Sequence, residues 1–186
     1  MKIDGEVVKE PNFTIENIHK GKRCFIIGTG PSLNNLTKSE IDFLKNEIVF
    51  GVNSFYKAGV VNTITPSYYA LFDNLYWNDE KHFFKEISTK YSTNPPVFLT
   101  DYRSKKILDS INNQEAIFLY SKKIPVNKIN VNLNKNMFIG QNVINSSIMI
   151  AMYMGFKEIY LLGCDYNSFA TEKPQHGWPL GQFLLL

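Results

Sequence analysis

The stretch from Cys24 to Leu36, CFIIGTGPSLNNL, joins an apolar run to a glycine-containing loop and then to residues typical of a helix start. Gly28 and Gly30 allow the backbone to turn tightly and to approach a ligand closely. The exposed amides of such a loop, together with the start of the next helix, favour an anion. The stretch therefore predicts a strand, a loop and a helix that together hold a phosphate compound.

Working outward from this loop, apolar strands alternate with helices. The expected strands are 23–28, 47–53, 66–73, 95–101, 115–120 and 157–165, the last as a central strand. The expected helices are 37–46, 79–91, 104–112 and 141–156. This alternation predicts an α/β, Rossmann-like fold, with a mainly parallel sheet and helices on both faces.

We expect one domain over residues 1–186, with a leader at 1–22 that packs on it. The chain ends on the apolar run GQFLLL, which suggests that a C-terminal portion is absent or that this run packs as a last strand or against a partner. The stretch 122–136 is weakly patterned and is interpreted as a solvated excursion, with a lid as the alternative.

Local patterns support two of the helices. Thr37 and Glu40 form a capping-box signature ahead of an apolar run. In the helix at 141–156, one face carries apolar residues at helical spacing, namely Ile144, Ile148, Ala151 and Met152, and Gly155 stands where a C-terminal cap belongs.

Composition narrows the class of protein. The net charge of +3, from 20 basic and 17 acidic residues, is too small to argue for nucleic acid, although it suits an acidic ligand or weak contact with an anionic membrane. Cys24 and Cys164 lie in apolar runs and are expected to be free thiols in a reducing compartment. No stretch resembles a signal peptide or a spanning helix, so we expect a cytoplasmic location.

The loop fits neither of two familiar nucleotide motifs. A Walker loop needs Gly-Lys-Ser/Thr, which does not occur in the sequence. A dinucleotide fingerprint needs a third glycine where this chain has Leu33, and an acid near the end of the second strand, where it has Asn53. Asn53 can still bond a ribose hydroxyl or a base edge. A tight turn without a ligand is the alternative.

Polar residues also follow two other expected strands. Asp73 and Asn74 close the third strand, and Gly163, Asp165 and Tyr166 follow the last. Because ligands of parallel sheets gather at the carboxyl ends of strands, these residues are site candidates. Asp73 and Asp165 are a candidate metal pair, or simply helix caps and turn formers.

The three histidines are predicted to differ in location and role. His19 and His82 are expected at the surface. His176, in EKPQHGWP, is either a general base over a bound ligand or part of a solvated loop.

Four segments together carry a family resemblance: IIGTGPSL, GVNSFY, YYALFDN and MGFKEIYLLGCDYN. They resemble the bacterial sialyltransferases of glycosyltransferase family 42. They equally resemble the related group labelled domain of unknown function 115, some of whose members are similar to archaeal pterin pyrophosphokinases. The matching segments span roughly residues 23–167. The resemblance implies a Rossmann-like fold and inverting transfer of sialic acid, or a related sugar, from a CMP-activated donor, with no cofactor or obligatory metal.

The resemblance also implies roles for individual residues. The nucleotide and donor would be bound by Gly28, Thr29, Gly30, Ser32, Asn53, Asn74, Asn142, Gly163 and Asp165. His176 would be the base, and Tyr166 would help the phosphate leave. The chain departs from the family pattern at Thr29, where Asn is usual, and at 142–144, where a Thr-Ser-Gly segment is usual. Tyr166 lies one position from the nearest family tyrosine.

The expected partners are a nucleotide-sugar donor, with a CMP-sugar favoured, and a surface glycan acceptor, as in lipopolysaccharide or capsule synthesis. We also expect a homo-oligomer, with peripheral contact at the inner membrane face. Two other hypotheses remain. One is a Mg²⁺-dependent pterin-type pyrophosphokinase that uses Asp73 or Asp165 as ligands. The other is a non-catalytic nucleotide-binding module in polysaccharide assembly.

Overall fold

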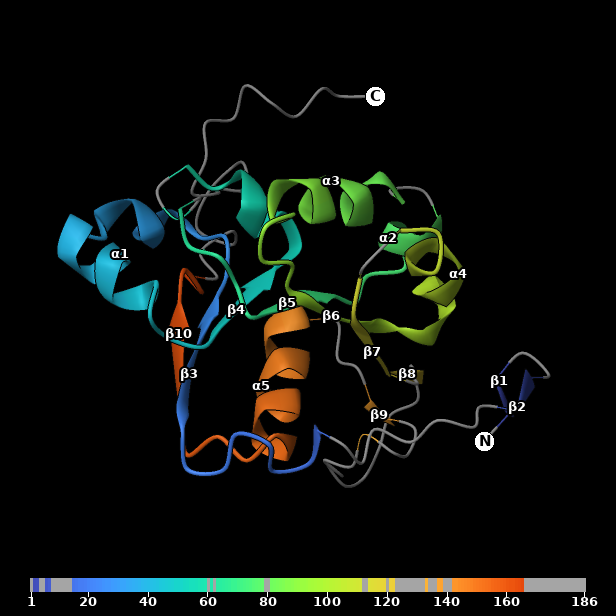
Figure 1. The fold of residues 1–186 in the computed structure, drawn as a ribbon. Helices are drawn as coiled ribbons and strands as arrows, with labels where there is room; N and C mark the ends of the chain where they lie inside the picture. The colour runs from blue at the N-terminus through green and yellow to red at the C-terminus, as the bar shows by residue number, and fades with distance from the viewer. Residues whose placement is uncertain are drawn as a thin grey trace.

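Six parallel strands form the central sheet of the computed structural model (Figure 1). In spatial order they are β10 (Glu158–Leu162), β3 (Arg23–Ile27), β4 (Val49–Val52), β5 (Tyr68–Leu71), β6 (Val97–Asp101) and β7 (Ala116–Leu119). The structure describes residues 2–3, 6–7, 15–59, 61, 63–78, 81–111, 114–119, 121–122, 133, 137–138 and 142–165. Two small two-stranded sheets accompany the central sheet. One pairs β1 (Lys2–Ile3) with β2 (Glu6–Val7), and the other pairs β8 (Ser121–Lys122) with β9 (Met137–Phe138).

Helices join the strands as the sequence predicts, with somewhat different ends. The α-helices are α1 (Lys38–Leu44), α2 (Leu75–Asn78), α3 (His82–Lys90), α4 (Lys105–Leu108) and α5 (Val143–Tyr153). The 3-10 helices are η2 (Pro31–Asn35), η3 (Asn53–Lys57) and η4 (Tyr102–Ser104). The helix predicted over 104–112 is thus a short α4 that η4 precedes.

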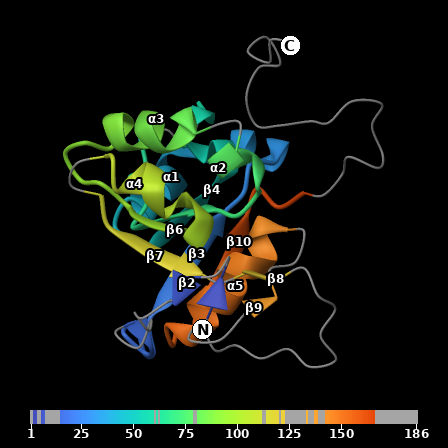
Figure 2. The same cartoon turned by 90° about the vertical axis from the view of Figure 1, so that its right-hand side faces the viewer.

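Helices lie on both faces of the sheet (Figures 1 and 2), and a hydrophobic layer packs them against each face. On one face, α5 packs Ile150 and Ala151 against Ile26 of β3 and Phe50 of β4. The other face carries α1, α3 and α4, which contribute Leu44, Phe84, Ile87 and Leu108 to a layer with Ile27, Val49 and Tyr69. The Rossmann-like α/β prediction is confirmed.

One strand lies elsewhere than predicted. The apolar run of β10 was expected at the centre of the sheet, but within the described residues β10 is an edge strand that pairs with β3 alone. Tyr160 and Leu161 are accordingly 43% and 45% exposed. An apolar run indicates that both faces of a strand are buried, but it does not indicate whether strands pair with it on both sides.

The predicted helix ends have the expected chemistry. The Thr37 hydroxyl accepts from the Glu40 amide, and the Glu40 carboxylate accepts from the Thr37 amide at 2.7 Å, so the capping box is complete. Gly155 has φ +83 and follows α5. Its amide donates to the carbonyl of Met152, and the Phe156 amide donates to that of Ala151, which is a Schellman motif.

Residues 15–22 of the predicted leader pack on the end of α5. The amides of Asn17 and His19 donate to the carbonyls of Tyr153 and Met154 at 3.0 and 2.9 Å. His19 was expected at the surface, but it is half-buried, with its ring against Phe156 and Nε2 2.7 Å from the Tyr68 hydroxyl. Burial, and secondarily the charge of Lys22, lowers the pKa of His19.

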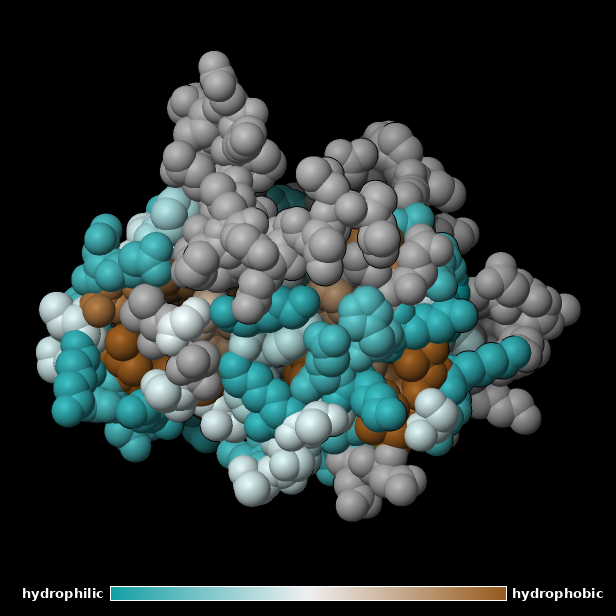
Figure 3. Space-filling view, turned by 90° about the horizontal axis from the view of Figure 1, so that it is seen from above, coloured by the Kyte–Doolittle hydropathy of each residue, from teal (hydrophilic) through white to brown (hydrophobic). Residues whose placement is uncertain are grey.

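The described surface is mixed in character. Met152 was expected in the core but is 55% exposed, because α5 rotates it away from the sheet. Figure 3 shows apolar side chains at the surface over α1, where Phe43 is 46% exposed.

Cys24 and Cys164 are free, as expected, and burial raises the pKa of the Cys24 thiol to about 12. Among the described residues, no helix is long and apolar enough to span a membrane.

Candidate functional site

The chain reverses its direction of travel across the sheet between β3 and β10. From β3 it proceeds through β4, β5 and β6 to β7, and then it returns to the other side of β3 as β10. The carboxyl ends of β3 and β10 lie side by side, with Ile27 opposite Leu162 (Figure 1). In open parallel sheets such a switch point is where ligands bind.

Backbone hydrogen bonds bring the loop after β3 against the loop after β10. The Gly28 amide donates to the carbonyl of Leu162, and the Gly30 amide to that of Gly163, both at 2.8 Å. A Cβ at Gly28 would lie 2.4 Å from the Gly163 carbonyl oxygen, and one at Gly30 would lie 1.9 Å from Asp165 Oδ2. Both glycines are therefore required by close approach of the two loops.

Asp165 supplies an anion to the loop. Its Oδ2 accepts from the Ser32 amide at 3.1 Å. The loop leads into the 3-10 helix η2, whose N-cap Gly30 has no side chain that could accept from the first backbone amides of the helix. The loop Gly28–Ser32 thus binds an anion, as predicted, but this anion is the carboxylate of Asp165 from the same chain. Asp165 itself is exposed and remains within reach of a ligand.

Asn53 closes the next strand in an unusual conformation. Its φ is +47, a left-handed value that Asn adopts more readily than most residues. The residue is half-buried and begins η3. Asn53 thus lies at the carboxyl end of β4, the strand next to β3, and its predicted role in nucleotide binding stays a prediction.

Asp73 and Asn74 close β5 and begin α2. Asp73 Oδ1 accepts from the Leu75 amide at 3.1 Å, and the Asn74 carbonyl accepts from the Asn78 amide at 3.1 Å. Asp73 therefore forms the turn that leads into α2, and turn formation was one of its structural alternatives. Both side chains are exposed at the same edge as the loops of β3 and β4. Among the described residues, no three His, Cys, Asp or Glu side chains are grouped closely enough to hold a metal ion.

The end of β6 carries an ion pair that sequence reasoning missed. Asp101 is buried and accepts from Arg103 Nε and Nη2 at 2.6 and 3.0 Å. The Arg103 guanidinium lies 4.8 Å from the ring centroid of Trp77 in α2. An acid that ends a strand two residues before an arginine, in TDYRS, is the signal that could have indicated this pair.

The remaining predicted site residues are Thr29, which is half-buried in the loop after β3, Asn142, Tyr166 and His176. Asn142 is the N-cap of α5, and its side chain accepts from the Ile144 amide at 2.8 Å. Tyr166 and His176 lie outside the described residues. The structure thus brings Gly28, Gly30, Ser32, Gly163 and Asp165 together, and it places Asn53 and Asn74 on the next two strands of the sheet.

Comparison with known proteins gives a family match and a likeness in fold to solved structures. The model of the family described as 6-hydroxymethylpterin diphosphokinase MptE-like matches residues 5–169. No protein of curated function matches the sequence.

Two solved structures share the fold. The MAf glycosyltransferase from Magnetospirillum magneticum AMB-1 is 16% identical, with a TM-score of 0.54 over 80% of this chain. This chain spans only 24% of that protein. The sialyltransferase CstII from Campylobacter jejuni, solved with cytidine-5'-monophosphate, is 17% identical, with a TM-score of 0.51, over 88% of this chain and 68% of its own. At these identities the likeness concerns the fold.

Proposed function

Because the chain belongs to the 6-hydroxymethylpterin diphosphokinase MptE-like family, we propose that it is a transferase that takes its donor group from a nucleotide bound at the β3–β10 switch point. The two loops that meet there, Gly28–Ser32 and Gly163–Asp165, form the floor of this site. Asn53 and Asn74 follow along the same edge and would contact the parts of the donor beyond the nucleoside.

The position of the Asp165 carboxylate carries this proposal. A carboxylate held on the loop repels a phosphate but accepts hydrogen bonds from ribose hydroxyls or a base amine. The nucleoside would therefore lie over Asp165 and the glycines, and its phosphates would point away, toward the amides and side chains at the ends of β4 and β5. This orientation leaves the transferable group near Asn74.

The donor that we favour is a nucleotide sugar, with a CMP-sugar first. The support is the shared fold with two glycosyltransferases, one of which was solved with cytidine-5'-monophosphate. In the proposed reaction an acceptor hydroxyl attacks the anomeric carbon, and the bond from that carbon to the phosphate oxygen breaks with inversion. His176 would take the hydroxyl proton, Tyr166 would donate to the departing phosphate, and Asn142 would help to orient the donor.

The second candidate is diphosphate transfer to a pterin-type alcohol, which the family match favours. This chemistry calls for Mg²⁺, which is usually held by one or two carboxylates together with the phosphates of the substrate. Asp73 or Asp165 would supply such a carboxylate, but not both to one ion, because β3 and β4 lie between the strands that they follow. Each also accepts a hydrogen bond from a backbone amide. In this reaction the alcohol oxygen would attack the β-phosphorus of the nucleoside triphosphate, the terminal diphosphate would pass to the alcohol, and the nucleoside monophosphate would leave. A bound metal would supply neutralisation of the phosphate charge.

Thermal unfolding with a nucleotide panel separates the two candidates. A ligand that binds only the folded state raises the melting temperature. CMP, CDP, UDP, GDP, ATP and a CMP-sugar would each be tested with and without Mg²⁺. A shift with cytidine nucleotides that is indifferent to Mg²⁺ supports glycosyl transfer. A shift with ATP that needs Mg²⁺ supports diphosphate transfer. Binding without turnover of any acceptor would indicate a non-catalytic module, and no shift would contradict the proposal.

A further inference from the structure

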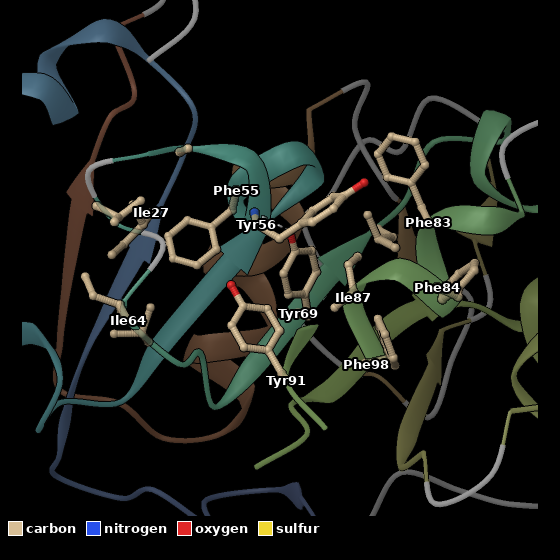
Figure 4. Close-up of a cluster of buried hydrophobic side chains, with 14 of the residues drawn as sticks. Ile27, Phe55, Tyr56, Ile64, Tyr69, Phe83, Phe84, Ile87, Tyr91 and Phe98 are labelled. Carbon is tan, nitrogen blue, oxygen red and sulfur yellow. Dashed lines mark hydrogen bonds between the residues drawn. The ribbon is translucent and has the colours of Figure 1, made fainter. Parts of the chain in front are cut away.

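The hydroxyl of Tyr69 lies inside the protein between two backbone atoms of the loop after β4. It donates to the Asn53 carbonyl at 2.7 Å and accepts from the Tyr56 amide at 3.0 Å. Tyr69 is on the neighbouring strand β5, and its side chain is fully buried (Figure 4). Burial raises the pKa of this phenol well above its ordinary value, so it stays protonated and can donate.

The segment that these bonds join is the turn that carries Asn53. Asn53 begins η3 with φ +47, and Ser54 inside the same turn also departs from helical geometry. A left-handed non-glycine residue is unfavourable unless its surroundings hold it. Tyr69 closes the turn across its first and fourth residues, and so it fixes the peptide that leaves Asn53.

Two side chains of α3 hold the other end of the same turn. The Tyr56 hydroxyl donates to the Glu86 carboxylate, and the Lys90 ammonium donates to the Tyr56 carbonyl. Desolvation lowers the pKa of Lys90 below its ordinary value. Tyr56 is therefore fixed through its amide, carbonyl and hydroxyl, and Tyr69 provides the contact that reaches Asn53 itself.

We propose that Tyr69 is a positioning residue for the nucleotide site, which sets the direction of the Asn53 side chain without touching the ligand. This inference rests on the proposed function of the β3–β10 site, and it adds to that function the residue that orders its β4 side. The expected consequence is that ligand affinity depends on a hydroxyl buried in the core, below the ligand.

The chain offers a matched control for the test. Tyr91 is also buried, and its ring lies 6.4 Å from that of Tyr69, but its hydroxyl has no hydrogen-bond partner among the described residues. Tyr91→Phe therefore removes the same atom from the same layer without releasing Asn53. Asn53→Gly is the third variant, because glycine adopts the left-handed conformation freely and lacks the amide side chain.

The experiment measures the affinity for CMP of the wild type, Tyr69→Phe, Tyr91→Phe, Asn53→Gly and the double variant Tyr69→Phe/Asn53→Gly. Loss of one buried hydrogen bond predicts a fall in affinity of about five- to tenfold for Tyr69→Phe. Tyr91→Phe should bind like the wild type. In the double variant, Tyr69→Phe should cause little further loss, because its effect passes through Asn53. Additive losses, or an unchanged affinity in Tyr69→Phe, would overturn the inference.

A second measurement separates this inference from the proposed function. Hydrogen exchange of the Tyr56 amide, which donates to Tyr69, should be accelerated in Tyr69→Phe. Exchange of the Ala58 amide, which donates to the Phe55 carbonyl at 3.0 Å, is the reference within the same turn. If the wild type binds no nucleotide, the proposed function fails, and exchange still decides the role of Tyr69. Unchanged exchange at Tyr56 would show that Tyr69 does not hold the turn.

Discussion

The backbone amide of Ser32 donates to Asp165 across 133 positions of sequence, at 3.1 Å. This bond joins the loop after the first strand of the sheet to the loop after the last. In the proposed nucleotide site, the carboxylate would favour ribose or base over phosphate, because it accepts hydrogen bonds and repels phosphate.

Asp165→Ala is expected to weaken CMP binding by about tenfold or more, since a hydrogen bond to a charged acceptor contributes about 1.5–3 kcal/mol. Calorimetric titration at constant ionic strength measures the change. Asp109→Ala is the control, because it removes an exposed carboxylate that pairs with Lys105 outside the site. Tighter binding in Asp165→Ala would mean that a phosphate lies on the loop.

Gly30→Ala is expected to lower the free energy of unfolding by about 1–3 kcal/mol, a typical cost of overpacking. The new Cβ would lie 1.9 Å from Asp165 Oδ2 and 2.8 Å from the backbone oxygen of Gly163. Urea denaturation gives the value. Gly59→Ala is the control, because a Cβ there would meet nothing within 4 Å. Equal effects of the two substitutions would show that the loops are not in close contact.

Thr37→Ala should cost about 1 kcal/mol of stability, because α1 loses its N-cap and half of the capping box. Thr37→Ser keeps the hydroxyl and should stay near the wild type. The denaturation midpoints of the three proteins, compared at equal slope, measure the effect. A Thr37→Ser variant as unstable as Thr37→Ala would assign the loss to the methyl group instead.

Stability should fall as the pH is lowered through the range below about 6.5. The pKa of His19 is lowered in the folded state from 6.5, chiefly by burial, so the unfolded chain binds the proton more readily. The loss begins near the unfolded pKa and is complete below the folded one. Urea midpoints across this range, for the wild type and His19→Asn, isolate the contribution. An identical pH response in both proteins would refute it.

His176→Ala should reduce turnover by about 10²–10⁴, the usual contribution of a general base, with CMP affinity nearly unchanged. The measurement is the initial rate of sugar transfer together with the dissociation constant. His82→Ala, which removes an exposed histidine of α3, is the control. Unchanged turnover in His176→Ala would remove this residue from the mechanism.

Sequence alone determined the six strands of the central sheet and the helices α1, α3, α4 and α5, whereas α2 and the two small sheets were not predicted. Apolar runs bounded by glycine, proline and capping signals predicted all six strands, and the Thr37–Glu40 box and Gly155 have the predicted roles at the ends of α1 and α5. These features are local, because a capping hydrogen bond or a left-handed turn depends on residues within a few positions. The parallel arrangement followed from the alternation itself, since parallel strands need crossover helices.

Only the tertiary structure decided what depends on neighbours distant in sequence. It placed β10 at the edge of the described sheet and packed the His19 ring against Phe156. It also brought the Asp165 carboxylate to the loop that contains Ser32. It also brought the hydroxyl of Tyr69 to Asn53, through a residue that sequence patterns identify only as part of a buried strand. Strand order and side-chain contacts arise from packing of the whole chain, and hydrophobic periodicity records that a face is buried without recording what covers it.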